Sequence, residues 1–290
     1  MSSFPPPQRP QELLRRAGLR AKKSWGQNFL CDPTVLQSIT EAIAPSPRGP
    51  IVELGAGLGA LTYHLAVAGA PILAIERDRD LAPILQRYLS WASHFEVRQA
   101  NVLRLDYGAL AHELGGPLTV VGNLPYQLSG RILVALADAA VAVRRAVLMV
   151  QREVAERLVA PPGGRTYGLL SVLVQRAFTP HIVRLVAPSC FHPPPRVESA
   201  VVSLLGQDEQ RDPADERAMV AVARAAFSGR RKNLRNALRG GLHADAASID
   251  GVLQQAQIAG TVRAETLSCA AFAHLGRCVA AAGLLPGTAP

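Results

Sequence analysis

Residues 51–59 read IVELGAGLG, a short apolar run with one acidic residue that leads into three spaced glycines. The run 51–54 has the length and composition of a buried parallel strand, and a segment with helical period follows over 60–68. Glycines at such a strand end let backbone N–H groups approach a ligand without a Cβ in the way. Ligands of open parallel sheets bind beyond the carboxyl ends of the strands. The stretch therefore predicts a strand-to-helix turn that holds a ligand.

The same alternation of apolar runs and helical segments continues beyond this turn. Further strands are expected at 71–76, 95–99, 118–122 and 146–150. Strands that alternate with helices at this spacing indicate a doubly wound parallel sheet and hence an α/β fold. Two later runs, at 181–186 and 200–205, follow each other without a long helix between them and predict an antiparallel edge.

Three regions are expected along the chain. Residues 1–21 are basic and proline-rich and predict a disordered tail. A Rossmann-like domain is expected over 22–206. The composition turns polar and charged around 206–213, and only helical periodicity follows, so a small all-helical domain is expected over 207–290.

The composition favours a polyanionic partner and a reducing compartment. Lys and Arg exceed Asp and Glu by 31 to 22, a formal net charge of +9, although a genome biased towards Arg codons would have the same effect. The four cysteines and seven histidines show no metal-ligand or disulfide spacing. No apolar run reaches the roughly 18 residues of a membrane span. We expect a cytoplasmic protein with neither a metal nor a membrane partner.

A candidate cofactor site follows from the strand ends. The second strand ends in Glu76, whose carboxylate could accept both hydroxyls of a ribose. Together with the glycine turn, this predicts an adenosine-bearing ligand. Gly55, Gly57 and Ala60 also satisfy the dinucleotide fingerprint, so a nicotinamide enzyme fits this stretch too. A turn that needs its glycines for packing alone is the structural alternative.

The fourth strand ends in NLPY, residues 123–126, which suits methylation of an exocyclic amine. The lone pair of adenine N6 is delocalised into the ring, so the amine is a poor nucleophile. The Asn123 side-chain oxygen and a backbone carbonyl could accept its N–H bonds and favour a tetrahedral nitrogen in the transition state. Pro125 would fix the turn. Tyr126 would stack on an extruded base, which supplies about 1–3 kcal/mol. The alternative is a turn in which Asn caps the next helix.

Two basic clusters lie outside these motifs, over 9–23 and over 224–239. The second contains no acidic residue, and Arg231, Arg235 and Arg239 are spaced by four, which would place them on one face of a helix. Such a face suits the phosphate backbone of a folded RNA. A solvated surface is the alternative, especially for the first cluster. The candidate RNA-binding residues are Lys22, Lys23, Arg230, Arg231, Lys232 and Arg235.

Five stretches together carry a resemblance to a known family. They read KSWGQNFL at 23–30, ELGAGLG at 53–59, NLPY at 123–126, FHPPPRVESAVV at 191–202 and RRKNLRNAL at 230–238. In this order and spacing, over about residues 20–285, the chain closely resembles the ribosomal RNA adenine dimethyltransferase family. The resemblance implies a class I S-adenosylmethionine-dependent methyltransferase sheet. It further implies N6-dimethylation of two adjacent adenosines in the 3′-terminal hairpin loop of small-subunit (16S) rRNA, within a pre-assembled subunit. Nothing in the sequence requires more than a monomer.

The resemblance also implies roles for single residues. Tyr126 and Phe191 would sandwich the target base, and Asn123 would contact both cofactor and adenine. The implied cofactor-binding residues are Asn28, Leu30, Gly55, Gly57, Glu76, Asn101 and Asn123. The implied catalytic residues are Asn123, Leu124, Pro125, Tyr126 and Phe191. Two positions depart from the family pattern: Asn101 stands where Asp is usual, and Trp25 replaces a smaller apolar residue.

Three other functions are compatible with parts of the sequence. The first is a large-subunit (23S) rRNA adenine methyltransferase of the macrolide-resistance type, which Leu124 and the 230–238 stretch disfavour. The second is a non-catalytic assembly factor or RNA-binding relative, supported only by Asn101. The third is a nicotinamide oxidoreductase, which would leave NLPY and both basic clusters unexplained.

Overall fold

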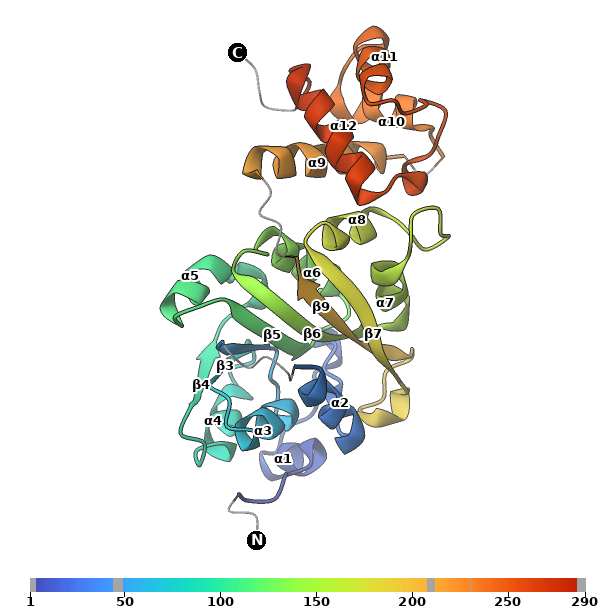
Figure 1. Ribbon diagram of the computed structural model, residues 1–290. Coiled ribbons are helices and arrows are strands. Elements are labelled where there is room, and N and C mark those ends of the chain that lie inside the picture. Colours follow the sequence, from blue (N-terminus) through green and yellow to red (C-terminus); the bar gives the residue numbers. More distant parts are fainter. Residues whose placement is uncertain (1–3, 44–48, 208–211, 230, 286–290) are drawn as a thin grey trace. The chain divides into compact units, whose positions relative to one another are not determined.

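The computed structural model describes residues 4–43, 49–207, 212–229 and 231–285. The chain forms two compact units, and each is described by itself. The first comprises Met1–Ala155 and Phe178–Gly206, and the second comprises Glu156–Ala177 and Gln207–Pro290. Figure 1 shows the elements of both.

A seven-stranded sheet forms the core of the first unit. Its order is β4-β3-β2-β5-β6-β9-β7. The neighbours from β4 to β6 pair in parallel, whereas β9 is antiparallel to both β6 and β7. The α/β prediction with an antiparallel edge is therefore confirmed. The strands span β2 (Ile51–Leu54), β3 (Ile72–Glu76), β4 (Phe95–Gln99), β5 (Leu118–Asn123), β6 (Val143–Gln151), β7 (Phe178–Val186) and β9 (Ser199–Gly206).

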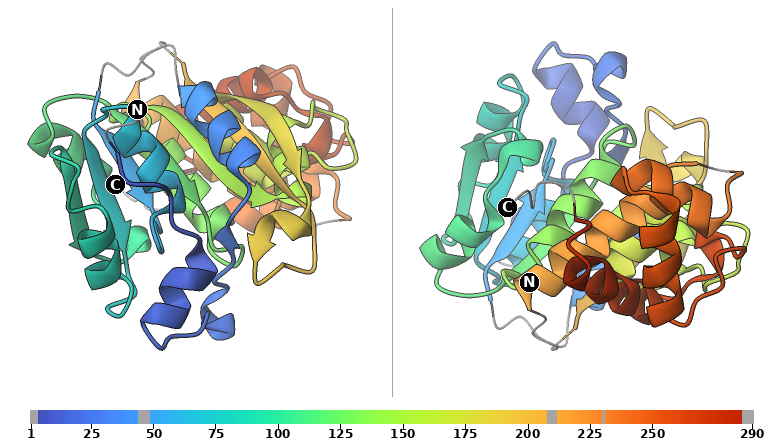
Figure 2. Two further views of the ribbon diagram at one scale, coloured as in Figure 1. Left: turned by 90° about the horizontal axis from the view of Figure 1, so that it is seen from below. Right: turned by 90° about the horizontal axis from the view of Figure 1, so that it is seen from above.

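Short helices follow most of the parallel strands. Helix α2 packs on β6 and β7, and α3 packs on α2 and β3, as the views of Figure 2 allow the reader to follow. Residues such as Ile39, Leu61 and Val147 form one continuous apolar cluster there. The helices span α2 (Pro33–Ile43), α3 (Ala60–Val67), α4 (Ala82–Tyr88), α5 (Tyr107–Glu113) and α6 (Ser129–Asp138), and α7 (Arg152–Val159) begins in this unit and ends in the second. The packing of these helices on the sheet holds strands β2, β3 and β5 in place, and the candidate site lies at their carboxyl ends.

The N-terminal region is ordered over its described part, so the prediction of a disordered tail over 1–21 is wrong for residues 4–21. A helix, α1 (Pro10–Arg16), has proline at its first position and buries Leu13 and Leu14 in a cluster beneath α4. The Tyr63 hydroxyl donates to the Pro5 carbonyl at 2.6 Å. The apolar pair within an otherwise basic stretch was the missed signal, because burying it offsets the entropy of ordering the segment.

A two-stranded antiparallel ribbon joins two distant segments of the first unit. Strand β1 (Phe29–Leu30) pairs with β8 (Phe191–His192), with Leu30 opposite Phe191. Two-residue strands leave no periodic signal in a sequence, and the pairing partner lies about 160 residues away. The ribbon was therefore not expected. The ribbon holds the segment before β1, residues 22–28, near the carboxyl ends of β2, β3 and β5.

The second unit is helical but larger than the expected 207–290. Residues 156–177, which the sequence analysis assigned to the first domain, cluster with it. The reason is packing: Tyr167 and Val172 are buried in its core, and the Tyr167 hydroxyl donates to the Leu267 carbonyl at 2.9 Å. The helices are α8 (Leu169–Gln175), α9 (Pro213–Ala226), α10 (Leu234–Leu242), α11 (Ala246–Gln255) and α12 (Cys269–Ala281).

Helix α10 begins later than the periodicity indicated. The expected helix began at Arg231, but Asn233 is the N-cap and its side chain accepts the Asn236 N–H at 3.0 Å. An Asn cap sets a helix start more firmly than charge spacing does. Arg231 therefore precedes the helix and does not share a helical face with Arg235.

Candidate active site

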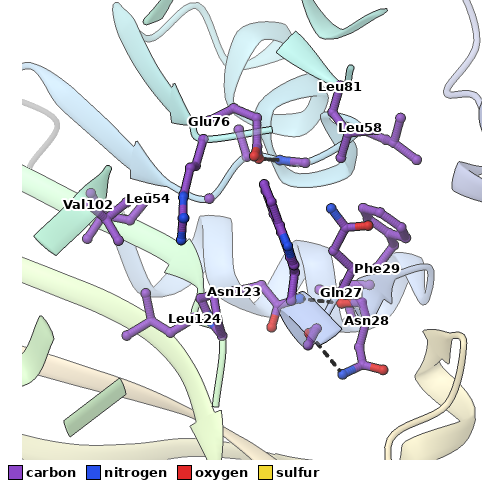
Figure 3. A pocket seen from close by; sticks show the side chains of 18 of the residues that line it. Gln27, Asn28, Phe29, Leu54, Leu58, Glu76, Leu81, Val102, Asn123 and Leu124 are labelled. Atoms are coloured by element: carbon purple, nitrogen blue, oxygen red, sulfur yellow. Dashed lines mark hydrogen bonds between the residues drawn. The ribbon is translucent and has the colours of Figure 1, made fainter. Parts of the chain in front are cut away.

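A cavity of about 320 Å³ opens at the carboxyl ends of β2, β3 and β5. Figure 3 shows side chains converging on it from these strand ends and from the N-terminal side. On that side the wall is formed by residues 24–30, which belong to a segment we call the strap (residues 22–30). A concave site of this size at this edge of a parallel sheet suits a small-molecule ligand.

The glycine turn after β2 forms the floor of the cavity. Gly55 and Gly57 have φ of 72° and 57°, a region that side-chain-bearing residues rarely adopt. A Cβ on Gly57 would lie 3.1 Å from the ring of Phe29 in the strap. The Gly57 backbone N–H donates to Glu76 Oε2 at 2.7 Å. Both the dihedral angles and the close approach of the strap therefore require glycine here.

Glu76 links the ends of β2 and β3. Its Oε2 accepts from Gly57, and its Oε1 accepts the Asp78 N–H at 2.6 Å. Burial raises the pKa of Glu76, against the effect of these hydrogen bonds. Each carboxylate oxygen keeps a further acceptor position after these bonds. The side chain is thus held in place at the cavity with capacity to accept ligand hydroxyls.

Glu53 is a second acidic side chain at the cavity, and its position inside an apolar strand run gave no signal of a role. It is 2% exposed. Its Oε2 and the hydroxyl of Thr62 are buried atoms without a hydrogen-bond partner among the described residues. Burial, with a contribution from Glu76, raises the pKa of Glu53 to about 8. A carboxyl with this pKa is neutral near pH 7, so it lines the cavity as a hydrogen-bonding group without a charge.

Asn123 sits at the end of β5 with a fixed amide orientation. Its Nδ2 donates to the Asn28 backbone carbonyl at 2.7 Å. A carbonyl oxygen can only accept, so the amide nitrogen must face the strap and the amide oxygen must face away from it. Figure 3 shows this arrangement. Asn123 therefore presents an acceptor at the cavity.

The turn after Asn123 is rigid. The Leu124 N–H donates to the Met149 carbonyl at 3.1 Å, and the Leu128 N–H donates to the Pro125 carbonyl at 2.9 Å. The Tyr126 hydroxyl and Ser199 Oγ are 2.7 Å apart. Burial raises the pKa of the half-buried Tyr126, which lines the cavity. Its ring is thus held at both ends while remaining accessible from the cavity.

Asn101 follows β4 and lines the same cavity. Its Oδ1 caps a 3₁₀ turn, Val102–Arg104, by accepting the Leu103 N–H at 3.1 Å. The oxygen retains one further acceptor position, and the amide nitrogen has two donors. Asn can therefore do the capping that an Asp would do at this position, without the charge.

Phe191 differs from the other expected cofactor-binding and catalytic residues, which all line the cavity. It is 4% exposed and packs in the apolar cluster with Leu30 and Ile39. It is absent from the cavity wall, so it cannot stack on a base in this conformation. Its place in β8 explains this: the pairing with Leu30 directs the ring into the core.

The expected RNA-binding residues divide into three groups. Lys22 is engaged by Asp78 and Asp80, with Nζ 2.7 Å from a carboxylate oxygen of each. Arg235 forms a bidentate ion pair with Asp250 of α11, with both distances 2.5 Å. Arg231 and Lys232 are exposed before α10. Arg230 and the side chain of Lys23 lie outside the described residues.

Two features are absent from the part of the chain that the structure describes. Across ranges 4–43, 49–207, 212–229 and 231–285, no group of three His, Cys, Asp or Glu side chains could hold a metal ion. Within the same ranges, no helix has both the length and the apolarity to cross a membrane.

The sheet order and the site together define a class of protein. A parallel sheet with one reversed strand, β9, between β6 and β7, a glycine turn after β2, a buried carboxylate at the end of β3 and NLPY beginning at the end of β5 characterise class I S-adenosylmethionine-dependent methyltransferases. The acceptor positions that remain on the Glu76 carboxylate suit the ribose hydroxyls of this cofactor. The family model for "Ribosomal RNA adenine dimethylase" matches residues 18–274. The chain belongs to this family.

Similar sequences agree with this assignment. A "Ribosomal RNA small subunit methyltransferase A" of Anaeromyxobacter dehalogenans (strain 2CP-C) is 46% identical over 279 residues, which is 92% of this chain and 96% of that protein. A protein of the same name from Myxococcus xanthus (strain DK1622) is 40% identical, over 92% of this chain and 94% of its own. A nicotinamide oxidoreductase is thereby set aside.

Similar solved structures agree on the fold. A dimethyladenosine transferase from Plasmodium falciparum has a TM-score of 0.71 at 20% identity, covering 88% of this chain and 98% of its own. The 23S rRNA methyltransferase ErmE has a TM-score of 0.67 at 25% identity, covering 87% of this chain and 100% of its own. The class I methyltransferase fold is thus shared over most of the chain.

Stability should depend on the ionisation of Glu53. Its pKa in the folded protein, about 8, lies above the ordinary value of 4.5. Between these values the unfolded state releases a proton that the folded state keeps, so stability falls as pH rises from about 5 to about 8. Because one pKa unit corresponds to 1.36 kcal/mol, the loss is on the order of 3 kcal/mol.

We therefore expect Glu53→Gln to flatten this part of the pH profile of the ligand-free protein. Urea unfolding at pH 5.5, 6.5, 7.5 and 8.5 measures the effect. The matched control is Glu41→Gln, which changes an exposed carboxyl on α2. An unchanged pH slope in Glu53→Gln would show that this carboxyl is already ionised in the folded protein.

Proposed function

We propose that the enzyme transfers methyl groups from S-adenosylmethionine to N6 of two adjacent adenosines in the 3′-terminal hairpin loop of small-subunit (16S) rRNA. Each adenosine would receive two methyl groups. The similarity to proteins named small subunit methyltransferase over 92% of the chain supports the choice of subunit. The substrate is a pre-assembled small subunit, and the enzyme acts on it as a monomer in the cytoplasm.

The orientation of Asn123 carries this proposal. Because the strap carbonyl of Asn28 holds the amide nitrogen, the amide oxygen is free to accept an N–H of the target amine. Accepting that bond favours a more tetrahedral nitrogen and frees its lone pair for attack. The interaction strengthens as positive charge develops on the nitrogen, so it stabilises the transition state more than the bound substrate.

The other residues of the cavity hold the two substrates. S-adenosylmethionine supplies an electrophilic methyl group. Glu76 would accept hydrogen bonds from the ribose hydroxyls of the cofactor, and Gly55 and Gly57 would contact its methionine portion through their backbone. Asn101 would accept a hydrogen bond from the amine of the cofactor's adenine. Leu30 closes the apolar part of the cavity with its buried side chain.

Tyr126 is the platform for the extruded base in this proposal. Its hydroxyl is held by Ser199, and the Ser129 Oγ donates to its backbone carbonyl at 3.0 Å. A ring fixed in this way loses little entropy on stacking, which supplies about 1–3 kcal/mol per base. The role of Phe191 as a second face of the sandwich requires its ring to leave the core.

Mapping the product tests the proposed function directly. The purified enzyme is incubated with labelled S-adenosylmethionine and small subunits that lack the modification, and modified nucleosides are located by mass spectrometry. We expect N6,N6-dimethyladenosine at two adjacent positions near the 3′ end. Transfer to large subunits alone would replace this proposal with the 23S activity. Cofactor binding with no transfer to either subunit would favour a non-catalytic assembly factor.

Removing the Asn123 acceptor should slow methyl transfer. We expect Asn123→Ala to lower kcat by on the order of 100-fold, the usual effect of deleting one polar group aimed at developing charge. Asn123→Asp should also be slow, because a carboxylate cannot donate to the Asn28 carbonyl. Single-turnover assays with saturating cofactor measure the step. A rate within threefold of wild type in Asn123→Ala would exclude the proposed role.

Arg231 and Lys232 should bind RNA through its phosphates. We expect the double change Arg231→Glu and Lys232→Glu to weaken binding to small subunits by at least tenfold and to reduce its salt dependence. Cofactor affinity should not change. The matched control is Arg235→Gln, since Arg235 pairs with Asp250 and should affect the stability of the helical unit instead. Equal losses of RNA affinity in both variants would contradict this division.

A further inference from the structure

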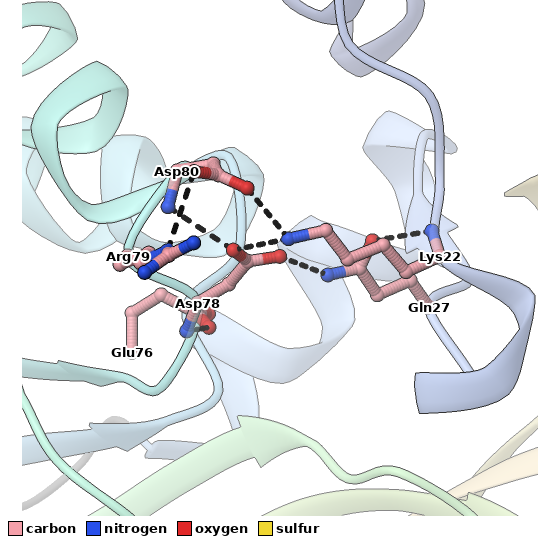
Figure 4. A network of polar contacts seen from close by, with 6 residues as sticks. All are labelled: Lys22, Gln27, Glu76, Asp78, Arg79 and Asp80. Carbon is pink, nitrogen blue, oxygen red and sulfur yellow. Dashed lines mark hydrogen bonds and ion pairs between the residues drawn. The ribbon is translucent and has the colours of Figure 1, made fainter.

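Asp78, just after β3, binds the strap at two points. Its Oδ1 is 2.7 Å from Lys22 Nζ, and its Oδ2 accepts a hydrogen bond from Gln27 Nε2 at 2.8 Å. The Gln27 side-chain oxygen in turn accepts the Lys22 backbone N–H at 2.8 Å. Figure 4 shows the resulting closed ring. Each end of the strap loop 22–27 is thus tied to one carboxylate.

The carboxylate of Asp78 is fixed and charged. Its side chain is 1% exposed, and the Asp80 N–H donates to its Oδ1 at 3.1 Å. Burial alone would raise the pKa of Asp78, but the hydrogen bonds from Lys22, Asp80 and Gln27 outweigh it, and the pKa lies below its usual value. A buried charge is stable only while paired, so an undocked strap would leave this carboxylate without its main partners.

Trp25 closes the strap loop against the cavity. Its ring lies 5.0 Å from Lys22 Nζ and 4.9 Å from the Arg77 guanidinium carbon, both measured to the ring centroid. Cations at these distances over an indole are attracted to its face. Trp25 lines the cavity and is still 40% exposed, so it lies at the cavity mouth. The cation that binds Asp78 also holds this ring in place.

The ring of bonds also leads to the proposed catalytic group. Gln27 directly precedes Asn28, whose carbonyl accepts from Asn123 Nδ2. Displacing Gln27 would move the carbonyl that sets the orientation of the Asn123 amide. The carboxylate of Asp78 thus reaches Asn123 through two consecutive strap residues, Gln27 and Asn28, although Asp78 is not one of the residues that line the cavity.

We propose that Asp78 is a positioning residue that, through Lys22 and Gln27, latches the strap over the bound cofactor and sets the orientation of Asn123. The inference rests on the proposed function, because it takes the cavity as the S-adenosylmethionine site. The latch slows cofactor dissociation and supports catalysis through the Asn28 carbonyl. It also gives Lys22 a role in the cofactor site in place of RNA binding.

The first test is the rate of cofactor dissociation in Asp78→Asn. If the oxygen of the new amide keeps the bond from Lys22, the NH₂ group of that amide faces Gln27 Nε2, so two donors meet. Rotating the Gln27 amide would relieve this contact, but its NH₂ group would then face the Lys22 backbone N–H, which is also a donor. We expect S-adenosylmethionine to dissociate at least about tenfold faster, the effect of losing one hydrogen bond to a charged group. Rapid mixing with excess S-adenosylhomocysteine, followed by Trp25 fluorescence in a Trp91→Phe background, measures the rate.

Two further variants separate latching from general stability. In the double change Asp78→Asn with Gln27→Glu, the new amide can donate to the new carboxylate, which still accepts the Lys22 backbone N–H. Each bond then has a donor and an acceptor again, so we expect the dissociation rate to return most of the way to the wild-type value. Asp80→Asn is the matched control, because Asp80 also contacts Lys22 but its side chain is 41% exposed. We expect less than a threefold effect there. If Asp78→Asn does not fold, Lys22→Met tests the same bond from its more exposed side.

The steady-state constants of Asp78→Asn should change together. KM for the cofactor should rise and kcat should fall, because both retention and Asn123 are affected. Acrylamide should quench Trp25 more strongly as the strap loosens. A lower unfolding temperature with unchanged dissociation, quenching and kcat would overturn the latch and leave the proposed function intact. Failure of the wild-type protein to bind S-adenosylmethionine would instead overturn the proposed function.

Discussion

The buried carboxylate of Glu76 organises the centre of this molecule. By accepting one backbone N–H from the turn after β2 and one from the turn after β3, it ties two neighbouring strand ends together at the point where the cavity opens. Charge-assisted bonds to backbone groups are among the stronger hydrogen bonds in proteins, and burial makes their loss costly. The glycine turn, the start of the Asp78 loop and the ligand-facing edge are all positioned by this one side chain.

Three carboxylates within a few residues of these strand ends differ in their surroundings and therefore in their chemistry. Glu53 has no partner for one oxygen and keeps its proton near neutral pH, whereas Asp78 is surrounded by donors and stays ionised. Glu76 lies between these extremes, buried but bonded to two N–H groups. One site can thus hold neutral and charged carboxyl groups side by side, because burial raises the pKa of each group and the donors around it lower that pKa to different extents.

The sequence predicted those parts of the fold and site that depend on local pattern. The glycine turn, Glu76 and Asn123 each lie at the carboxyl end of a parallel strand. Parallel strands bring these ends to one edge of the sheet, so the positions of these residues in the sequence were enough to predict that they line one cavity. The ribbon between residues 29–30 and 191–192, the docking of the strap on Asp78 and the core position of Phe191 depend on contacts between distant segments of the chain. Such contacts leave no periodicity. Arg235 and Lys22 show the same limit, since charge spacing cannot reveal that a nearby carboxylate has already paired with them.

The insertion of residues 156–177 into the helical unit has a consequence for how this chain can be divided. The chain passes between the two units three times, after Ala155, after Ala177 and after Gly206. A polypeptide cut at residue 206 would keep the helix α8 but lose the helices that bury Tyr167 and Val172. The helical unit is therefore no detachable C-terminal module, because part of its core comes from a segment that precedes the last two strands of the sheet, β7 and β9.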